Sequence, residues 1–344
     1  KDDSLLPVTY IIIDMVFKRH QEDMRMDKIR IPETELELSP LGLGCVNAGI
    51  KWDGADADRL FDAFYDMGGN LYDTARVYSD WIPPETGRSE RVLGDWLSRS
   101  GKRSHVVLIT KGGHPDMTVP QPDMHANRTT PEDMRKDLEL SLQTLRTDYI
   151  DLYFFHRDNE ALPAGELIEV MEEFVKKGNI RYYGCSNWST ARMREADEYC
   201  RLHGYRGFAA NQALYNAGLA HMKAPSDDTL TVMDKTMRSY HLENPANLAM
   251  PYMAACSGFF HKYLSGGAGA VQNSEYYTEG NIRIAEKLQI LAGRYNATLT
   301  QVLLGFFTCQ GFTCLPLYGP RSAEDLQEAM NAFEIPFEKD DYQF

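Results

Sequence analysis

The sequence lacks the patterns that mark several common classes of protein. It has no Cys-x-x-Cys pair and no His/Cys spacing of a metal site, and its six cysteines are scattered over nearly the whole chain. It has no basic run, and 50 acidic against 36 basic residues give a net charge of −14, whereas a nucleic-acid binder needs a basic face. Its one candidate targeting segment, at 10–17, is too short to span a bilayer and is interrupted by Asp14. We therefore expect a cytoplasmic protein with reduced thiols, no metal, and no nucleic-acid or membrane partner.

Strand-like and helix-like segments alternate from about residue 41 to residue 332. Periodicity and turn residues predict eight strands, at 41–45, 70–73, 105–110, 149–155, 180–185, 207–211, 247–252 and 314–318. They predict helices at 56–67, 89–100, 130–145, 167–177, 189–204, 229–242, 279–294, 299–310 and 322–332. Because the units follow one another without a break in composition, the pattern favours a closed parallel barrel over an open doubly wound sheet. The Rossmann fingerprint GxGxxG after a strand is also absent.

The fold class predicted is therefore α/β, a single (β/α)8 TIM barrel, for which 344 residues is an ordinary length. We assign residues 25–344 to this barrel and residues 1–24 to an N-terminal extension or leader. Residues 28–31 and 36–38 predict a β-hairpin that plugs the bottom of the barrel. Long loops are expected at the opposite face, where strands end, and substrate specificity is assigned to the loops at 79–88, 112–129 and 213–228.

Four polar residues follow three of the predicted strands: Asp73, Tyr78, Lys111 and His156. Because the carboxyl ends of barrel strands meet at one face, we expect them to share one pocket. A phenol has a pKa of about 10, and a nearby ammonium lowers it toward working pH. Asp73 can keep Lys111 charged, and His156 can polarise a carbonyl oxygen. This set suits the donation of a proton to an oxygen that gains negative charge, as when a ketone becomes an alcohol.

Neither an activated nucleophile nor a metal cluster is visible, so the hydride for such a reaction would come from a cofactor. Polar or aromatic side chains at later strand ends can hold one: Ser186, Asn187, Gln212 and Tyr252. The segment 319–322 follows the last strand and opens a helix, and with Arg321 it is typical of an anion site. Loop residues Trp81, His114 and Trp188 are candidates for substrate contact. The alternative for each tryptophan is a packed anchor, and the alternative for His114, as for His125, is a solvated loop residue.

The stretch 69–78 resembles the signature of the aldo-keto reductase family, in which an Asp and a Tyr lie five residues apart. Gly-Arg-Ser-Glu at 87–90 resembles the block that follows. Later blocks match in order at 109–111, 151–156, 184–187 and 211–212. The resemblance extends from about residue 27 to residue 332.

The resemblance implies a TIM barrel that binds NADP(H), sometimes NAD(H), without a Rossmann domain. It implies that Tyr78 is the general acid, that Lys111 and Asp73 tune it, and that His156 orients the carbonyl. Further contacts implied for the cofactor are Ser186, Asn187 and Gln212 at the carboxamide, Tyr252 on the ring, Lys262 near the pyrophosphate, and Gly319, Arg321 and Ser322 near the adenosine phosphate.

Three departures from the family pattern concern the cofactor. Met-Ala-Ala at 253–255 stands where the family often has Ser-Pro-Leu. Glu328 is followed by Ala329 in place of the Asn that often helps to hold the adenine. Asp325, in the first turn of the presumed phosphate-binding helix, is an unfavourable charge for a 2′-phosphate.

The function predicted is the reversible, nicotinamide-dependent reduction of an aldehyde or ketone, with a sugar or another polar metabolite among the candidates. The partner would be a small-molecule carbonyl or alcohol, and the oligomeric state is left open. The alternative is a cofactor-binding regulatory or interaction subunit with little turnover.

Overall fold

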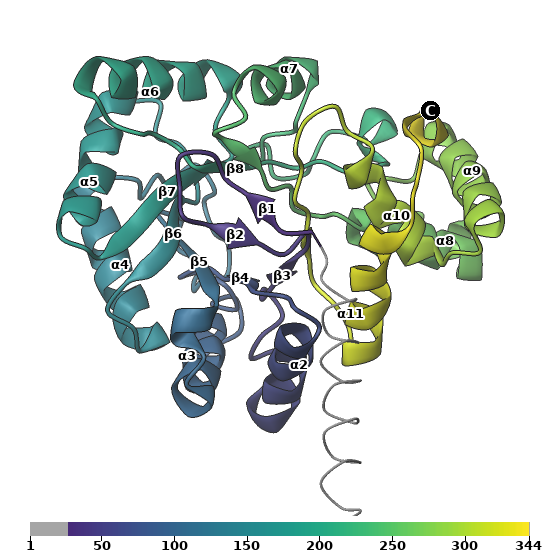
Figure 1. Cartoon of the computed structure of the whole chain (residues 1–344), viewed down its shortest axis with the longest axis horizontal. Coiled ribbons are helices and arrows are strands. Elements are labelled where there is room, and N and C mark those ends of the chain that lie inside the picture. The colour runs from purple at the N-terminus through teal and green to yellow at the C-terminus, as the bar shows by residue number, and fades with distance from the viewer. Residues whose placement is uncertain (1–26, 344) are drawn as a thin grey trace, which may run out of the picture.

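The computed structural model describes residues 27–343 and shows strands surrounded by helices (Figure 1). The strands are β1 (Ile29–Arg30), β2 (Glu37–Leu38), β3 (Gly42–Gly44), β4 (Leu71–Asp73), β5 (Val107–Gly112), β6 (Ile150–Phe155), β7 (Ile180–Ser186), β8 (Ala210–Gln212), β9 (Leu248–Ala249) and β10 (Leu317–Tyr318). The α-helices are α2 (Gly54–Asp66), α3 (Arg88–Ser100), α4 (Pro131–Leu145), α5 (Ala164–Lys176), α6 (Thr190–His203), α7 (Lys235–Glu243), α8 (Phe259–Gly266), α9 (Glu279–Tyr295), α10 (Leu299–Thr308) and α11 (Ala323–Met330). Among these helices none is long and apolar enough to cross a membrane. The predicted extension 1–24, with its apolar run, lies outside the described residues.

Strands β3 to β10 form one parallel sheet in the order β10, β3, β4, β5, β6, β7, β8, β9. The chain segments at its two edges also meet. The backbone N–H of Leu315 donates to the carbonyl of Ala249, and that of Leu317 to the carbonyl of Pro251, each at 2.9 Å. These bonds close the sheet into a ring with helices outside it, so the predicted (β/α)8 barrel is confirmed.

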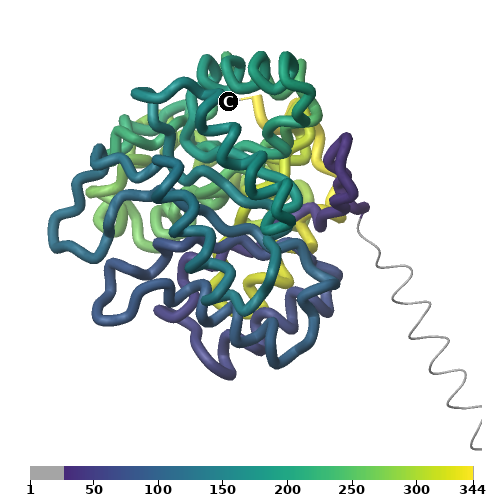
Figure 2. The backbone as a smooth tube through the Cα atoms, turned by 90° about the vertical axis from the view of Figure 1, so that its left-hand side faces the viewer, coloured from purple at the N-terminus to yellow at the C-terminus, as the bar shows by residue number. Residues whose placement is uncertain are grey.

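A β-hairpin covers the N-terminal end of the barrel, as predicted. Strand β1 pairs antiparallel with β2, and the buried side chains of Ile31, Leu36 and Leu38 pack with the residues that fill the barrel. The guanidinium of Arg206, just before β8, donates to the carbonyl of Pro32 at 2.7 Å. Figure 2 shows the hairpin at one end of the molecule and the loops that follow β4 and β5 at the other. The plug therefore leaves the opposite end of the barrel for the site.

Helix α8 lies in the segment 253–278, which the sequence predicts to be loop. It begins after Gly258, whose φ is 75°, and ends before Gly267, whose φ is 65°. Phe259 and Phe260 are buried and anchor it to the core. A helix of 8 residues between glycines is too short to show a helical period, which explains why the sequence does not reveal it.

Helix α7 begins at Lys235, six residues later than the predicted start at 229. Asp234 caps this helix, because its side chain accepts a hydrogen bond from the N–H of Met237 at 2.8 Å. Just before it, Val232 forms a parallel bridge with Leu214. The chain before the cap is therefore extended, and it covers the end of the barrel instead of lengthening the helix.

Gly94 lies where α3 packs against α4. A Cβ at this position would lie 2.5 Å from the carbonyl oxygen of Thr144 and 2.8 Å from the Cα of Leu145, both of them backbone atoms. We expect Gly94→Ala to lower the free energy of unfolding by about 2 kcal/mol, measured by urea denaturation. Gly293→Ala on α9 is the matched control, because a Cβ there would meet open space. It should raise stability by about 0.5–1 kcal/mol, and a similar gain for Gly94→Ala would contradict close packing between α3 and α4.

Candidate active site

The tetrad of Asp73, Tyr78, Lys111 and His156 comes together at the C-terminal end of the barrel, with Lys111 at its centre. The ammonium Nζ of Lys111 donates to Asp73 Oδ2 at 2.8 Å, to the phenol oxygen of Tyr78 at 3.0 Å and to the carbonyl of Thr74 at 2.8 Å. The ring centroids of Tyr78 and His156 are 5.6 Å apart. The four side chains predicted from separate parts of the sequence therefore form one cluster.

Strand register accounts for this convergence. Asp73 is the last residue of β4 and pairs with Ile109 of β5, so Lys111 lies two residues further along β5 and faces the same side. His156 directly follows β6, and its backbone N–H donates to the carbonyl of Gly112 at 2.8 Å. Neighbouring parallel strands thus deliver the acid, the ammonium and the imidazole to one rim.

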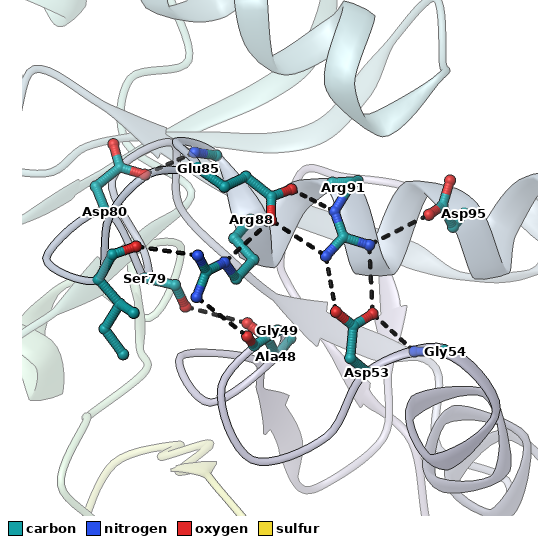
Figure 3. Close-up of polar contacts among 12 residues, drawn as sticks. Ala48, Gly49, Asp53, Gly54, Ser79, Asp80, Glu85, Arg88, Arg91 and Asp95 are labelled. Atoms are coloured by element: carbon teal, nitrogen blue, oxygen red, sulfur yellow. Dashed lines mark hydrogen bonds and ion pairs between the residues drawn. The ribbon is translucent and has the colours of Figure 1, made fainter.

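The loop that carries Tyr78 is fastened on both sides (Figure 3). The hydroxyl of Ser79 donates to the carbonyl of Ala48 at 3.0 Å, and Asp80 accepts from the N–H of Gly87 at 2.6 Å. A charged cluster then joins the end of this loop to α3 and consists of Asp53, Glu85, Arg88, Arg91 and Asp95. These contacts limit the movement of the phenol relative to β5.

Two opposing effects act on the pKa of the Tyr78 phenol. Burial raises the pKa of Tyr78, and the adjacent Lys111 ammonium counteracts that rise. Burial alone would lower the pKa of Lys111, but Asp73 and Tyr78 raise it, so the ammonium stays charged at neutral pH. The second oxygen of Asp73 accepts from Gln212 Nε2 at 2.8 Å, which holds the carboxylate against the lysine.

A second imidazole, that of His114, lies beside His156 of the tetrad. Burial and the neighbouring His114 and Arg157 keep the pKa of His156 well below its ordinary value. Burial, with help from Arg157, lowers the pKa of His114 to about 4. The ring centroids of the two histidines are 4.6 Å apart, and His156 Nδ1 has no hydrogen-bond partner among the described residues. At neutral pH both rings are uncharged, so His156 can offer a substrate one N–H as a neutral donor.

A cavity of about 730 Å³ is lined by Asp73, Tyr78 and His156 and continues to the end of β10. Its volume lies within the roughly 300–1,000 Å³ typical of ligand sites. Most of the other predicted site residues also line it, namely Trp81, His114, Ser186, Asn187, Gln212, Tyr252, Lys262, Gly319, Arg321 and Asp325.

Four predicted residues do not line this cavity, and one of them, Lys111, contacts the lining residues Asp73 and Tyr78. Trp188 is fully buried and stacks on Phe155 with ring centroids 5.4 Å apart, so its predicted substrate contact is corrected to a packing role. Asn187 and Trp188 are adjacent in the chain and face opposite sides, so Asn187 lines the cavity and Trp188 does not. Ser322 caps α11, and Glu328 accepts from the hydroxyl of Thr298 at 2.6 Å.

Arg157 and Asp227 line the cavity although the sequence did not single them out. Arg157 Nη2 lies 3.2 Å from Asp227 Oδ2, and its Nε donates to Thr229 Oγ1 at 3.1 Å. The sequence feature that could have identified Arg157 is its position directly after His156 at a strand end. Asp227 had no signal beyond its position in a loop assigned to specificity.

Asn187 holds Tyr252 at the cavity wall. It follows β7 with a left-handed φ of 61°. Its Oδ1 accepts from the hydroxyl of Tyr252 at 2.7 Å and from the N–H of Thr231 at 3.1 Å, while its Nδ2 donates to Ser186 Oγ at 3.1 Å. The hydroxyl of Tyr252 is therefore held by a residue at the end of β7.

The cysteines and acidic residues form no other reactive centre in the described residues. All six cysteines are free and buried. Within 27–343, no group of three or more His, Cys, Asp or Glu side chains is arranged to hold a metal ion.

The family model of the aldo/keto reductases matches residues 40–343. The chain belongs to the aldo/keto reductase family. The resemblance drawn from the sequence blocks is thus confirmed. Members of this family generally use nicotinamide cofactors.

Several curated aldo/keto reductases are similar to the chain. Norsolorinic acid reductase B of Aspergillus parasiticus is 27% identical over 333 residues, which cover 90% of this chain and 83% of that protein. The aryl-alcohol dehydrogenase [NADP(+)] of Phanerodontia chrysosporium is 25% identical over 338 residues, covering 91% and 83%. The aldo-keto reductase YhdN of Bacillus subtilis is 36% identical over 182 residues, covering 52% of each chain.

The cavity has the groups that a nicotinamide cofactor needs. Tyr252 offers an aromatic face, and His156, another lining residue, has a buried Nδ1 without a hydrogen-bond partner among the described residues. Three further residues adopt left-handed conformations, namely Met253, Cys256 and Ser257, with φ of 57°, 51° and 53°. Backbone of this kind is typical of anion-binding turns, and such strain in non-glycine residues is concentrated at functional sites.

Proposed function

We propose that this protein catalyses the reversible reduction of an aldehyde or ketone to an alcohol with a nicotinamide cofactor. The observation that carries the proposal is the contact of the buried Lys111 ammonium with both Asp73, at 2.8 Å, and the phenol of Tyr78, at 3.0 Å. A carboxylate–ammonium–phenol chain that ends at a cavity is suited to proton transfer and has no obvious structural purpose.

Each member of the tetrad has a part in this reaction. Tyr78 donates its proton to the carbonyl oxygen, and Lys111 stabilises the phenolate that remains. Asp73 keeps Lys111 charged. His156, as a neutral imidazole, donates an N–H to the same oxygen and orients it. A nicotinamide cofactor held in the cavity would supply the hydride. In the reverse direction the phenolate of Tyr78 accepts the proton of the alcohol.

The residues that would hold the cofactor follow from their positions in the cavity. We assign Ser186, Asn187 and Gln212 to the carboxamide, Tyr252 to the nicotinamide ring and Lys262 to the pyrophosphate. We assign Gly319, Arg321 and Asp325, which line the cavity, to the adenosine end, and Ser322 there only on the family resemblance. Glu328 is left out because its carboxylate is taken by Thr298. The family resemblance implies NADP(H), which the printed name of one relative also carries, and NAD(H) is the alternative.

The substrate would occupy the arm of the cavity between the tetrad and the loops. Trp81 and His114 line this arm with Met117, Met124 and Leu230. The charged pair Arg157–Asp227 adds polar surface. A mixed lining of this kind suits a small carbonyl compound that has both apolar and polar parts.

The proposal is tested with purified protein, NADH, NADPH and a panel of aromatic, aliphatic and hydroxylated aldehydes and ketones. Cofactor binding is followed by fluorescence, and turnover by the loss of reduced-nicotinamide absorbance. We expect binding and turnover with at least one carbonyl class. Tight binding without turnover on the whole panel would instead favour the regulatory or interaction subunit.

Lys111→Met is expected to lower kcat by roughly 30-fold to 100-fold. Without the ammonium, the main group that opposes the rise that burial causes in the pKa of Tyr78 is lost, so the basic limb of the pH–rate profile should move to higher pH. Exposed Lys136→Met is the control. If the unpaired Asp73 prevents folding, adding Asp73→Asn removes that buried charge. An unchanged pH profile in a folded variant would contradict the role of Lys111.

A further inference from the structure

Asp325 and Arg321 form a tight pair where the cavity reaches α11. Asp325 Oδ2 accepts from the backbone N–H of Arg321 at 2.8 Å and from its Nε at 3.4 Å. Its Oδ1 accepts from Arg321 Nη2 at 3.1 Å and from the hydroxyl of Tyr318 at 3.0 Å. The carboxylate is 7% exposed, whereas the arginine side chain is 74% exposed. The acid is therefore the fixed member of the pair, and the arginine is bound to it.

The carboxylate is ionised in this position. Burial alone would raise the pKa of Asp325, but the hydrogen bonds from Arg321 and Tyr318 lower it below its ordinary value. The first turn of α11 also contains Glu324, so two acidic residues complement the helix dipole there. The hydroxyl of Ser322 is engaged at the same turn, accepting from the N–H of Asp325 at 3.2 Å.

Among the described residues only Arg321 forms an ion pair with this acid, although Lys51, in the loop after the neighbouring strand β3, also lines the cavity. His261 lines the cavity near Arg321, but burial and Arg321 lower its pKa, so the ring is uncharged at neutral pH. Lys262 also lines the cavity, and its Nζ lies 3.4 Å from the carbonyl of Ser257, at the turn assigned to the pyrophosphate. The guanidinium at this end of the cavity, that of Arg321, is therefore already neutralised by Asp325.

This charge arrangement decides between the two nicotinamide cofactors. A phosphate monoester carries a charge of about −1.5 to −2 at neutral pH. The 2′-phosphate of NADP(H) would either face Asp325 or draw Arg321 away and leave a buried carboxylate without its cation, which is unfavourable. The 2′-hydroxyl of NAD(H) is neutral and can donate to a carboxylate, as it does to the acidic residue of NAD-binding Rossmann domains.

We propose, on the basis of the function proposed above, that Asp325 makes this protein bind NAD(H) at least as tightly as NADP(H). Asp325 acts by neutralising Arg321, so that a 2′-phosphate gains no net attraction there, whereas the 2′-hydroxyl of NAD(H) needs no cation. The preference therefore departs from the NADP(H) that the family resemblance implies.

The test is a measurement of Kd for NADH and NADPH by fluorescence titration or calorimetry, without substrate. For the natural sequence we expect a Kd for NADH no larger than that for NADPH. Asp325→Asn keeps the size and the acceptor for Tyr318 but removes the charge, and it should tighten NADPH by about tenfold and leave NADH within about twofold. Glu324→Gln, an exposed acid in the same turn, is the matched control and should tighten NADPH much less.

Competition of 2′,5′-ADP and of 5′-ADP with the dinucleotide measures binding at the adenosine end of the cavity alone, because these probes lack the nicotinamide. The unmodified protein should bind 5′-ADP at least as well as 2′,5′-ADP, and this measurement needs no variant. Binding of NADPH more than about tenfold tighter than NADH would overturn the preference, as would an Asp325→Asn variant with unchanged affinity for NADPH. If neither cofactor binds, the proposed function fails and the preference with it. If NADH binds well but no carbonyl is reduced, only the proposed function fails.

Discussion

Tyr78→Phe is expected to lower kcat by about 10³-fold, within the range that positioned acid–base groups contribute. The substitution removes one hydroxyl, so the carbonyl oxygen loses its proton donor while the ring and the cavity wall remain. The phenol contacts Lys111 at 3.0 Å, and that lysine keeps its bonds to Asp73 and Thr74, so the fold around it should persist. The Kd of the cofactor should change by less than about threefold, since Tyr78 acts on the substrate oxygen.

Single-turnover kinetics separate chemistry from cofactor binding in this variant. Tyr205→Phe is the matched control, because its hydroxyl lies at the surface and donates to Glu169 at 3.1 Å, and because Tyr205 precedes the N-terminal end of β8, opposite the end that lines the cavity. Turnover of Tyr78→Phe within about threefold of the natural protein would assign the proton donor to another group, with His156 as the first to examine.

The protein is expected to lose about 3 kcal/mol of stability as pH rises through the titration of one buried carboxyl, Glu90. Its side chain is fully buried on α3, and Thr110 Oγ1 donates to Oε1 at 2.6 Å. The nearest cation, Arg76 Nη1, is 3.9 Å from Oε2, which has no hydrogen-bond partner among the described residues. Burial raises the pKa of Glu90 from 4.5 to about 7, and this incomplete pairing does not offset it.

The sign of the effect follows from the two pKa values of Glu90. Below pH 4.5 the carboxyl is protonated in the folded and the unfolded chain alike. Between 4.5 and about 7 the unfolded chain releases its proton and the folded chain retains it, so the free energy of unfolding falls with pH. The stabilisation from the neutral acid is thus present at low pH and lost as pH passes through about 7.

Urea denaturation at about pH 5 and about pH 8 measures this loss. Because other groups also titrate, the informative quantity is the difference between the natural protein and Glu90→Gln, which cannot ionise at this position. The natural protein should lose more stability than Glu90→Gln over this range. Glu139→Gln on the exposed face of α4 is the control and should behave as the natural protein does. An equal pH dependence for Glu90→Gln would show that Glu90 does not titrate as inferred.

Much of the architecture was predictable because it depends on local pattern. The alternation of strand and helix periods needs only neighbouring residues, and it located all eight barrel strands of the described chain. Helix α8 was missed because its period is too short and its flanking glycines resemble loop. The start of α7 was misplaced because a long-range bridge between Val232 and Leu214, which no local pattern encodes, keeps the preceding residues extended.

The candidate tetrad was predictable for a related reason. In a parallel barrel every strand ends at the same rim, so a polar residue just after an apolar run is placed by topology alone. Trp188 was misassigned because adjacent residues at a strand end face opposite sides, and the sequence does not say which side is the cavity. Arg157 and Asp227 were missed because their pairing joins residues 70 positions apart.

The sequence by itself determined the barrel, its family and the strand ends that carry an acid, a phenol, an ammonium and an imidazole, because those follow from periodicity and order along the chain. Only the tertiary structure decided which charges neutralise one another. Gln212 reaches Asp73 across 139 residues, and Asp325 binds the guanidinium of Arg321 while Tyr318 holds it in place. Burial and distance determine how strongly charged groups interact, and both are defined only once the strands and helices have packed together.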